Sequence, residues 1–149
     1  MVATSGSVLL PTPAVDAYLT HLLPHTTLLT PNLPEALLLA ELAGRDFGKL
    51  QSLGLTERYD LAFFLASKVE WVLLKGGHLG YDLNGKKMVF DILVNSKGLS
   101  WQFTSDFSDS KNTHGTGCTL ACMPSNLHRS SILHFLSFSC NCVQYCFGI

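Results

Sequence analysis

The stretch Lys111-Asn112-Thr113-His114-Gly115-Thr116-Gly117-Cys118-Thr119-Leu120 leads from a polar loop through a Gly-Thr-Gly turn into an apolar segment. Two glycines that flank a hydroxyl residue allow backbone N–H groups to approach a ligand and to point the same way. A helix that begins at Gly117 or Cys118 adds its free N–H groups and its dipole, which favour an anion such as phosphate. The stretch therefore predicts a phosphate-binding turn, and a glycine turn that caps an ordinary helix is the simpler alternative.

Helices and strands alternate along the chain before this turn. Hydrophobic periodicity and helix-end signals predict helices over 13–23, 34–43 and 57–69 and strands over 26–30, 70–74, 88–94 and 99–104. The first helix carries an apolar stripe made of Val15, Tyr18, Leu19, Leu22 and Leu23. Pro24 ends that helix, residues 79–87 have a turn composition, and Asn95-Ser96-Lys97-Gly98 predicts a hairpin turn. The order is βαβαβ-like with one antiparallel hairpin, which indicates the α/β class.

Asn32 and Glu35 directly follow the strand predicted over 26–30. Asn32 is a good N-cap, and Glu35 falls in the first turn of the next helix, which Gly44 ends. Proteins of the α/β class bind ligands at the carboxyl ends of their strands. The pair is therefore a candidate ligand site, and the simpler interpretation is that both residues only cap the helix.

Lys75-Gly76-Gly77-His78 stands at the end of the strand predicted over 70–74. This position places the four residues at the same edge of a parallel sheet as Asn32. The simpler interpretations are a solvated loop lysine for Lys75 and a turn residue for His78. We assign a catalytic proton transfer to neither side chain.

Three motifs in this order resemble one family. They are Leu28-Leu29-Thr30-Pro31-Asn32-Leu33-Pro34-Glu35-Ala36, Val72-Leu73-Leu74-Lys75-Gly76-Gly77-His78 and Asn112-Thr113-His114-Gly115-Thr116-Gly117-Cys118-Thr119. They are similar to motifs of the hydroxymethylpyrimidine/phosphomethylpyrimidine kinases of thiamine biosynthesis, which belong to the ribokinase-like superfamily. Residues 1–6 resemble the end of a further family motif. The resemblance covers residues 1–121 and implies an incomplete three-layer α/β/α fold with a mainly parallel sheet and one antiparallel hairpin.

The resemblance implies ATP-dependent phosphorylation of hydroxymethylpyrimidine and of its monophosphate, with Mg²⁺ as a cofactor. Its catalytic residues would be Gly115, Thr116, Gly117 and Cys118. The first three residues and the Cys118 amide would form an anion hole for the transferring phosphoryl group. Cys118 would be the base, or the group that contacts the accepting oxygen. A buried structural thiol is the simpler interpretation of Cys118.

The resemblance also implies a set of nucleotide-binding residues. They are Asn32, Glu35, Lys75, Gly77, Asn112 and Thr113. In the family, the glutamate of the Asn-x-x-Glu element orients magnesium and its waters near the phosphates, so Glu35 is the expected metal residue. The expected partner is a small pyrimidine substrate, and a homo-oligomer is compatible with the resemblance.

Composition limits the classes of protein to which the chain can belong. Of its 149 residues, 47% are hydrophobic and 14% charged, which argues for a packed core and against disorder. The formal net charge of −1 indicates no nucleic-acid partner. The first residues lack the positive region of a secretory signal, and no apolar run reaches the ~18 residues that a membrane span needs. We expect a cytoplasmic protein without a membrane partner, whose five cysteines are mostly reduced thiols.

The chain departs from the family pattern at both ends. The family's core strand before the motif that residues 1–6 resemble is absent, and Met123-Pro124 would break the small-residue helix that follows the phosphate turn. We therefore expect a partial kinase domain over 1–121, without the N-terminal half of the family's domain, and a divergent tail over 122–149. Weak or absent catalysis by this chain follows from that expectation.

Two alternatives remain open for the function. One is a pyridoxal kinase-like activity, although the Asn-Thr-His before the glycines and the cysteine after them favour the pyrimidine enzymes. The other is a fragment or splice product without kinase activity.

Overall fold

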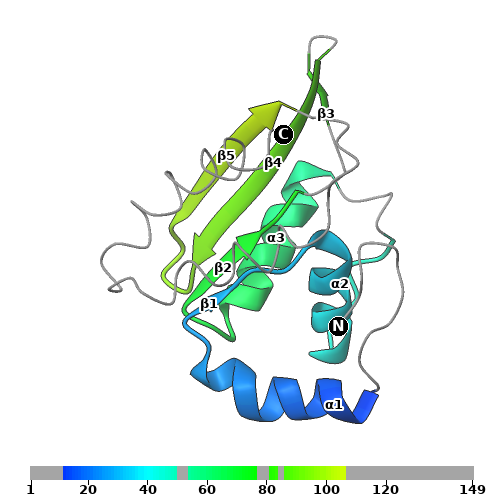
Figure 1. The fold of residues 1–149 in the computed structure, drawn as a ribbon, viewed down its shortest axis with the longest axis vertical. Coiled ribbons are helices and arrows are strands. Elements are labelled where there is room, and N and C mark those ends of the chain that lie inside the picture. Colours follow the sequence, from blue (N-terminus) through cyan, green and yellow to red (C-terminus); the bar gives the residue numbers. More distant parts are fainter. Residues whose placement is uncertain (1–11, 50–53, 77–80, 84–85, 107–149) are drawn as a thin grey trace, which may run out of the picture.

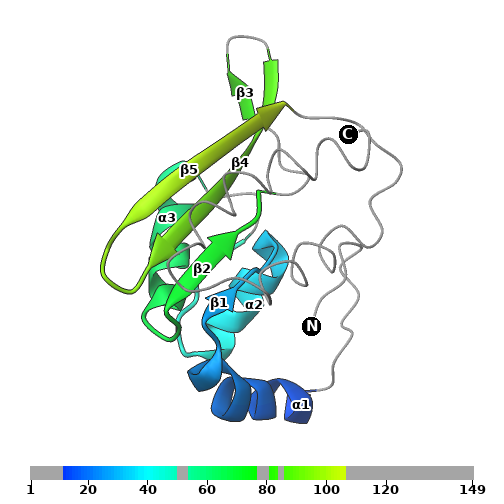
Figure 2. The ribbon, with the colours of Figure 1, turned by 60° about the vertical axis from the view of Figure 1, so that its left-hand side comes forward.

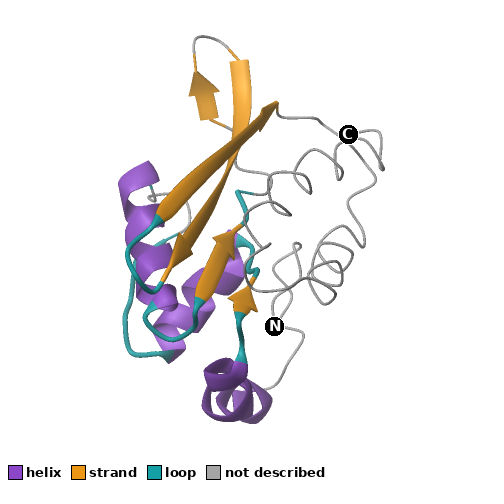
Figure 3. Ribbon diagram, turned by 90° about the vertical axis from the view of Figure 1, so that its left-hand side faces the viewer, coloured by secondary structure: helices purple, strands orange, loops and turns teal. Residues whose placement is uncertain are grey.

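The computed structural model describes residues 12–49, 54–76, 81–83 and 86–106. In this part of the chain, α2 (Leu33–Leu42) and α3 (Leu55–Ala66) lie together on one face of a five-stranded sheet (Figures 1 and 3). The helix α1 lies beyond the end of the sheet at which β1 begins (Figure 1). No helix in these ranges is long and apolar enough to cross a bilayer.

The sheet mixes parallel and antiparallel pairs. Its strands are β1 (Leu28–Leu29), β2 (Trp71–Leu74), β3 (Tyr81–Leu83), β4 (Lys86–Asn95) and β5 (Ser100–Asp106). β1 pairs parallel with β2, whereas β4 pairs antiparallel with β2, β3 and β5. The α/β class is confirmed, but the prediction of a mainly parallel sheet with one antiparallel hairpin is wrong for these strands. The segment 75–85 is shorter than the dozen or so residues that a helical crossover needs, so β4 returns antiparallel to β2.

The strand β3 lies within the region over 79–87 that the sequence predicted as a turn. Tyr81 pairs with Met88, and Leu83 pairs with Lys86. The dipeptide Asn84-Gly85 stands between these paired strands in the sequence, and it is the strongest short-range signal for a two-residue hairpin. The prediction missed the hairpin because the whole region over 79–87 has the composition of a turn.

The first helical segment changes geometry along its length. It begins as α1 (Thr12–Ala17), continues as a π-helix over Tyr18–Leu22 and tightens into a 3₁₀ turn over Leu23–His25. Pro24 does not end the segment, because it stands at the start of the 3₁₀ turn, where a missing N–H is tolerated. The π-helix also breaks the predicted apolar stripe. Leu22 is 60% exposed, since a π turn holds more residues than an α turn and shifts the side chains that follow.

The main core lies between the two helices and the sheet. Its fully buried members include Leu39 of α2, Leu61 and Leu65 of α3, and Val72, Leu74, Ile92 and Val94 of the strands. Strand side chains alternate between the two faces, so Leu73 and Leu93 lie on the other face, where Trp71, Trp101 and Phe103 pack against them. β2 and residues 92–94 of β4 are therefore apolar on both faces, which accounts for their continuous apolar sequences.

The remaining element boundaries follow the sequence closely. α2 begins and ends within one residue of the predicted 34–43, and Gly44 after it has a φ of 89°. α3 begins two residues before the predicted start and ends at Ala66, although Val69 is buried as its position in the pattern requires. The predicted strand over 26–30 is paired only at Leu28–Leu29. α2 and α3 share one face of the sheet, so a three-layer arrangement stays a prediction.

The predicted hairpin turn after β4 is confirmed. Asn95 is only 5% exposed, and its Oδ1 accepts the N–H of Lys97 at 3.0 Å and that of Leu99 at 2.9 Å. Gly98 has a φ of 85°, which a glycine adopts without strain.

We expect Asn95→Ala to lower the free energy of unfolding by about 1–2 kcal/mol, because two N–H groups of the turn lose their acceptor. Urea unfolding monitored by tryptophan fluorescence measures this change. Ser96→Ala is the matched control, since Ser96 is exposed in the same turn. Equal midpoints for the two variants would show that Asn95 does not hold the hairpin.

Candidate functional site

Two of the predicted motifs meet at the carboxyl ends of β1 and β2. The parallel pairing of these strands continues as a bridge between Asn32 and Lys75, and the Lys75 N–H donates to the Pro31 carbonyl at 3.0 Å. Figure 2 shows β1 and β2 side by side and pointing the same way. The fold thus brings Asn32 and Lys75 together at the edge of the sheet where the sequence predicted a ligand.

Asn32 and Glu35 form a capping box at the start of α2. The Oδ1 of Asn32 accepts the Glu35 N–H at 2.8 Å, and the Asn32 N–H donates to Oε2 of Glu35 at 3.1 Å. The predicted cap is therefore confirmed. The box uses one carboxylate oxygen, and within the described ranges Oε1 of Glu35 accepts no hydrogen bond. The side chain is held in place while one oxygen stays available for a ligand.

The turn after β2 is fixed by a residue that the sequence analysis did not select. The Gly76 N–H donates to Oδ1 of Asp91 in β4 at 2.7 Å. Gly76 also lies directly against the backbone of Phe90, since an added Cβ would collide with its carbonyl oxygen and lie 2.9 Å from its carbonyl carbon. The signal that could have revealed Asp91 is a carboxylate within the otherwise apolar run from Met88 to Val94.

The structure describes three of the predicted site residues. It brings together Asn32, Glu35 and Lys75, all partly buried. In the ranges that the structure covers, the Lys75 ammonium has no hydrogen bond or ion pair. The other predicted site residues lie outside the described residues: Gly77, Asn112, Thr113, Gly115, Thr116, Gly117 and Cys118.

Comparison with known proteins decides the family. A model of the phosphomethylpyrimidine kinase family matches residues 1–133. The chain belongs to the phosphomethylpyrimidine kinase family. The family predicted from the three motifs is therefore confirmed.

Individual family members agree with this assignment. The chain is 37% identical over 121 residues to the hydroxymethylpyrimidine/phosphomethylpyrimidine kinase of Salmonella typhimurium. It is 39% identical over 121 residues to the enzyme of the same name from Escherichia coli. Each alignment covers 81% of this chain and 41% of the relative, so the chain spans less than half the length of these kinases.

A solved structure supports the same fold. The crystal structure of phosphomethylpyrimidine kinase from Clostridium difficile 630 superposes with a TM-score of 0.62 at 21% sequence identity. The match covers 99% of this chain and 54% of that kinase. The described mixture of one parallel pair with antiparallel strands is thus set within the fold of a phosphomethylpyrimidine kinase.

The residues at this edge fit the cofactors of a kinase. A carboxylate oxygen is the kind of ligand that Mg²⁺ prefers, and Mg²⁺ usually takes only one or two carboxylates together with waters and phosphates. No cluster of three His, Cys, Asp or Glu side chains that could hold a metal occurs among the described residues. Glu35 therefore fits magnesium as a single protein carboxylate, and the Lys75 ammonium fits a phosphate.

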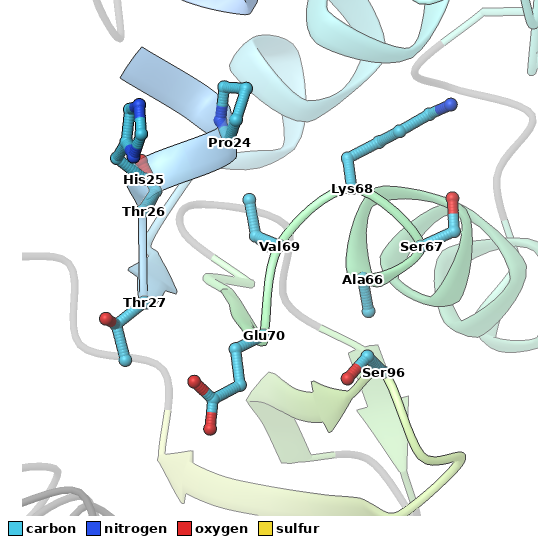
Figure 4. Close-up of a pocket in the computed structure, with 10 residues that line it drawn as sticks. All are labelled: Pro24, His25, Thr26, Thr27, Ala66, Ser67, Lys68, Val69, Glu70 and Ser96. Carbon is cyan, nitrogen blue, oxygen red and sulfur yellow. The ribbon is translucent and has the colours of Figure 1, made fainter. Parts of the chain in front are cut away.

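The open hollow shown in Figure 4 lies at the other end of β1 and β2, where these strands begin. Its volume is about 490 Å³, and its lining comes from the residues before β1, the start of β2 and the turn after β4. The side chains of Lys68 and Glu70 point in different directions there (Figure 4). The Thr26 and Ser67 hydroxyls already donate to backbone carbonyls, at 2.9 and 2.7 Å. Because a ligand site needs convergent polar groups, we place the candidate site at the Asn32–Lys75 edge instead.

Burial and the charge of Glu35 both affect the pKa of Tyr18 in the first helical segment. Burial raises the pKa of Tyr18 above its ordinary value of 10.0, and the negative charge of Glu35 raises it further. Tyr18 lies in the π-helical part of the segment and packs against the main core. Its phenol is therefore neutral throughout the physiological pH range.

We expect Gly76→Ala to lower the free energy of unfolding by roughly 1–3 kcal/mol, because the new Cβ meets the backbone of Phe90, which cannot rotate away. Chemical denaturation measures the change. Gly54→Ala is the matched control, since its Cβ meets only the flexible carboxylate end of Glu57. That control is expected to cost less than about 1 kcal/mol. The approach of Gly76 to β4 would be disproved by equal stability of the two variants.

The raised pKa of Tyr18 predicts a loss of stability at alkaline pH. The folded state binds the phenolic proton more tightly than the unfolded chain, so the free energy of unfolding falls as pH rises from about 10 through the folded-state pKa. Tyr18→Phe should remove this part of the pH dependence. Glu35→Gln should reduce it only partly, because burial is the larger cause. Urea unfolding between pH 8 and 11 tests this, and identical slopes for wild type and Tyr18→Phe would contradict it.

Proposed function

We propose that this chain takes part in the ATP-dependent phosphorylation of hydroxymethylpyrimidine and of its monophosphate in thiamine biosynthesis. The family membership and the names of its relatives support this proposal. The observation that carries it is the bridge between Asn32 and Lys75, because it joins two family motifs at one edge of the sheet. We assign to this edge the nucleotide phosphates and Mg²⁺.

Each residue at this edge has a distinct role in the proposal. Lys75 supplies a positive charge for phosphate oxygens, and within the described residues no carboxylate competes for its ammonium. Glu35 offers Oε1 to magnesium or its waters while Oε2 stays in the capping box. Asn32 fixes the orientation of that carboxylate. Bound Mg²⁺ neutralises charge on the phosphates and so favours transfer of the terminal phosphoryl group.

The roles of the remaining predicted residues are proposed from the family resemblance. Gly115, Thr116, Gly117 and the Cys118 amide would donate to the transferring phosphoryl group, and Cys118 would serve the accepting hydroxyl. Gly77, Asn112 and Thr113 would contact the nucleotide. These residues belong to a kinase-like part over 1–121, followed by a divergent tail over 122–149. We expect this chain to bind the nucleotide, with weak or absent catalysis.

We expect Glu35→Gln to weaken magnesium-dependent ATP binding about tenfold, which corresponds to ~1.4 kcal/mol. Glutamine keeps an oxygen for the Asn32 N–H but lacks the negative charge that magnesium prefers. Isothermal titration calorimetry of the purified 149-residue chain with ATP, with and without Mg²⁺, measures the loss. Glu41→Gln is the matched control, because Glu41 is an exposed glutamate of the same helix.

Equal affinities for Glu35→Gln and wild type would remove Glu35 from the proposed site. ADP release is measured in parallel with phosphomethylpyrimidine and with pyridoxal. A faster reaction with pyridoxal would favour the pyridoxal kinase-like alternative, and a chain that does not bind ATP at all would favour the non-catalytic alternative.

A further inference from the structure

Asp91 stands at an unusual position for a carboxylate. It lies in the middle of β4, between the buried residues Phe90 and Ile92, and it is itself partly buried. By strand alternation it shares a sheet face with Leu93, whose neighbours there are aromatic and aliphatic side chains. Its paired residue on β5 is Phe103. A charged group among apolar neighbours is costly unless a polar group compensates it.

The Asp91 carboxylate accepts a hydrogen bond from the backbone of the candidate nucleotide site. The β2–β4 ladder is paired up to Leu74 and Ile92. Two residues later, the Gly76 N–H donates to the Asp91 side chain at 2.7 Å instead of to a β4 carbonyl. The chain therefore leaves the sheet at Gly76, where the Asp91 carboxylate holds its backbone N–H. A hydrogen bond to a charged acceptor is among the stronger ones in proteins.

Lys75 immediately precedes Gly76, whose N–H donates to Asp91. The Lys75 N–H donates to Pro31, and Lys75 is bridged to Asn32, the N-cap of the helix that carries Glu35. Lys75 is thus held between two hydrogen bonds of adjacent backbone groups, one toward β1 and one toward β4. Close approach of the Gly76 backbone to Phe90 leaves the turn little room to move toward β4.

We propose that Asp91 is a positioning residue of the nucleotide site, one that holds the Lys75–Gly76 turn so that the Lys75 ammonium faces the bound phosphates. This inference rests on the proposed function. Asp91 does not touch the nucleotide in this arrangement. It acts through the Gly76 amide, and its loss leaves Lys75 attached to a turn that samples other conformations.

The test uses two variants of the 149-residue chain. Asp91→Leu removes the acceptor of the Gly76 N–H, but leucine suits an apolar strand position in size and polarity. If Asp91 does not position Lys75, this variant should therefore fold and bind ATP with unchanged affinity. Asp91→Asn retains an oxygen acceptor for the Gly76 N–H. Asp60→Leu is the matched control, because Asp60 is an exposed carboxylate on α3. Thermal unfolding confirms that each variant is folded at the temperature used.

Two readouts are measured on these chains. The first is hydrogen exchange of the Gly76 amide by NMR without nucleotide, which we expect to be about tenfold faster in Asp91→Leu and close to wild type in Asp91→Asn. The second is the affinity for magnesium-ATP, which we expect to fall about tenfold in Asp91→Leu. In a Lys75→Ala background, Asp91→Leu should cause little further loss, because both changes act on one interaction.

Each result bears on the inference in a defined way. Unchanged exchange at Gly76 in Asp91→Leu overturns it, whatever ATP does. Faster exchange with unchanged ATP affinity, or an equal further loss in the Lys75→Ala background, also overturns it. If the wild-type chain binds no ATP, the proposed function fails, and the exchange of Gly76 alone decides whether Asp91 fixes the turn.

Discussion

The parallel pairing of β1 with β2 is the constraint on which the rest of the described structure depends. Only two residues of β1 join the ladder, yet the pairing sets the register between the two segments that follow β1 and β2. It aligns the ends of both strands, so that Pro31 accepts from Lys75 and Asn32 bridges to Lys75. Helix α2 begins at this point because Asn32 also caps it. One short pairing thereby fixes a helix start, a lysine and a carboxylate relative to one another.

Burial on both faces explains why so short a pairing is sufficient. β2 is apolar throughout, with Val72 and Leu74 toward the helices and Leu73 toward the other face. A register shift by one residue would exchange these two faces, and a shift by two would move Lys75 into the ladder. On the helix side, Ala36, Leu39 and Ala40 of α2 are buried in the same core. Packing of α2 therefore reinforces the register that places its first turn beside Lys75.

Much of the described fold could be predicted from the sequence, and the failures have physical causes. The α2 capping box, the hairpin turn at Asn95 and the strand over 70–74 depend on local signals, which the sequence shows directly. The relative directions of the strands cannot be predicted from local signals, because an apolar run has the same pattern in parallel and antiparallel strands. The exposure of Leu22 depends on a π-helix, for which the sequence has no recognised signal. At the site, Asn32, Glu35 and Lys75 came from motifs, whereas Asp91 required knowledge of which strand passes Gly76.

The structural and the functional interpretations of the capping residues are not alternatives in this chain. A cap needs one oxygen of Glu35, and a carboxylate has two. The capping box restricts the rotation of the Glu35 side chain, and a ligand group that is already ordered loses less entropy when it binds. The same reasoning applies at Gly76, where a hydrogen bond that closes the sheet also limits the freedom of Lys75. At this edge, the interactions that hold the backbone together are also those that would prepare the side chains for a phosphate ligand.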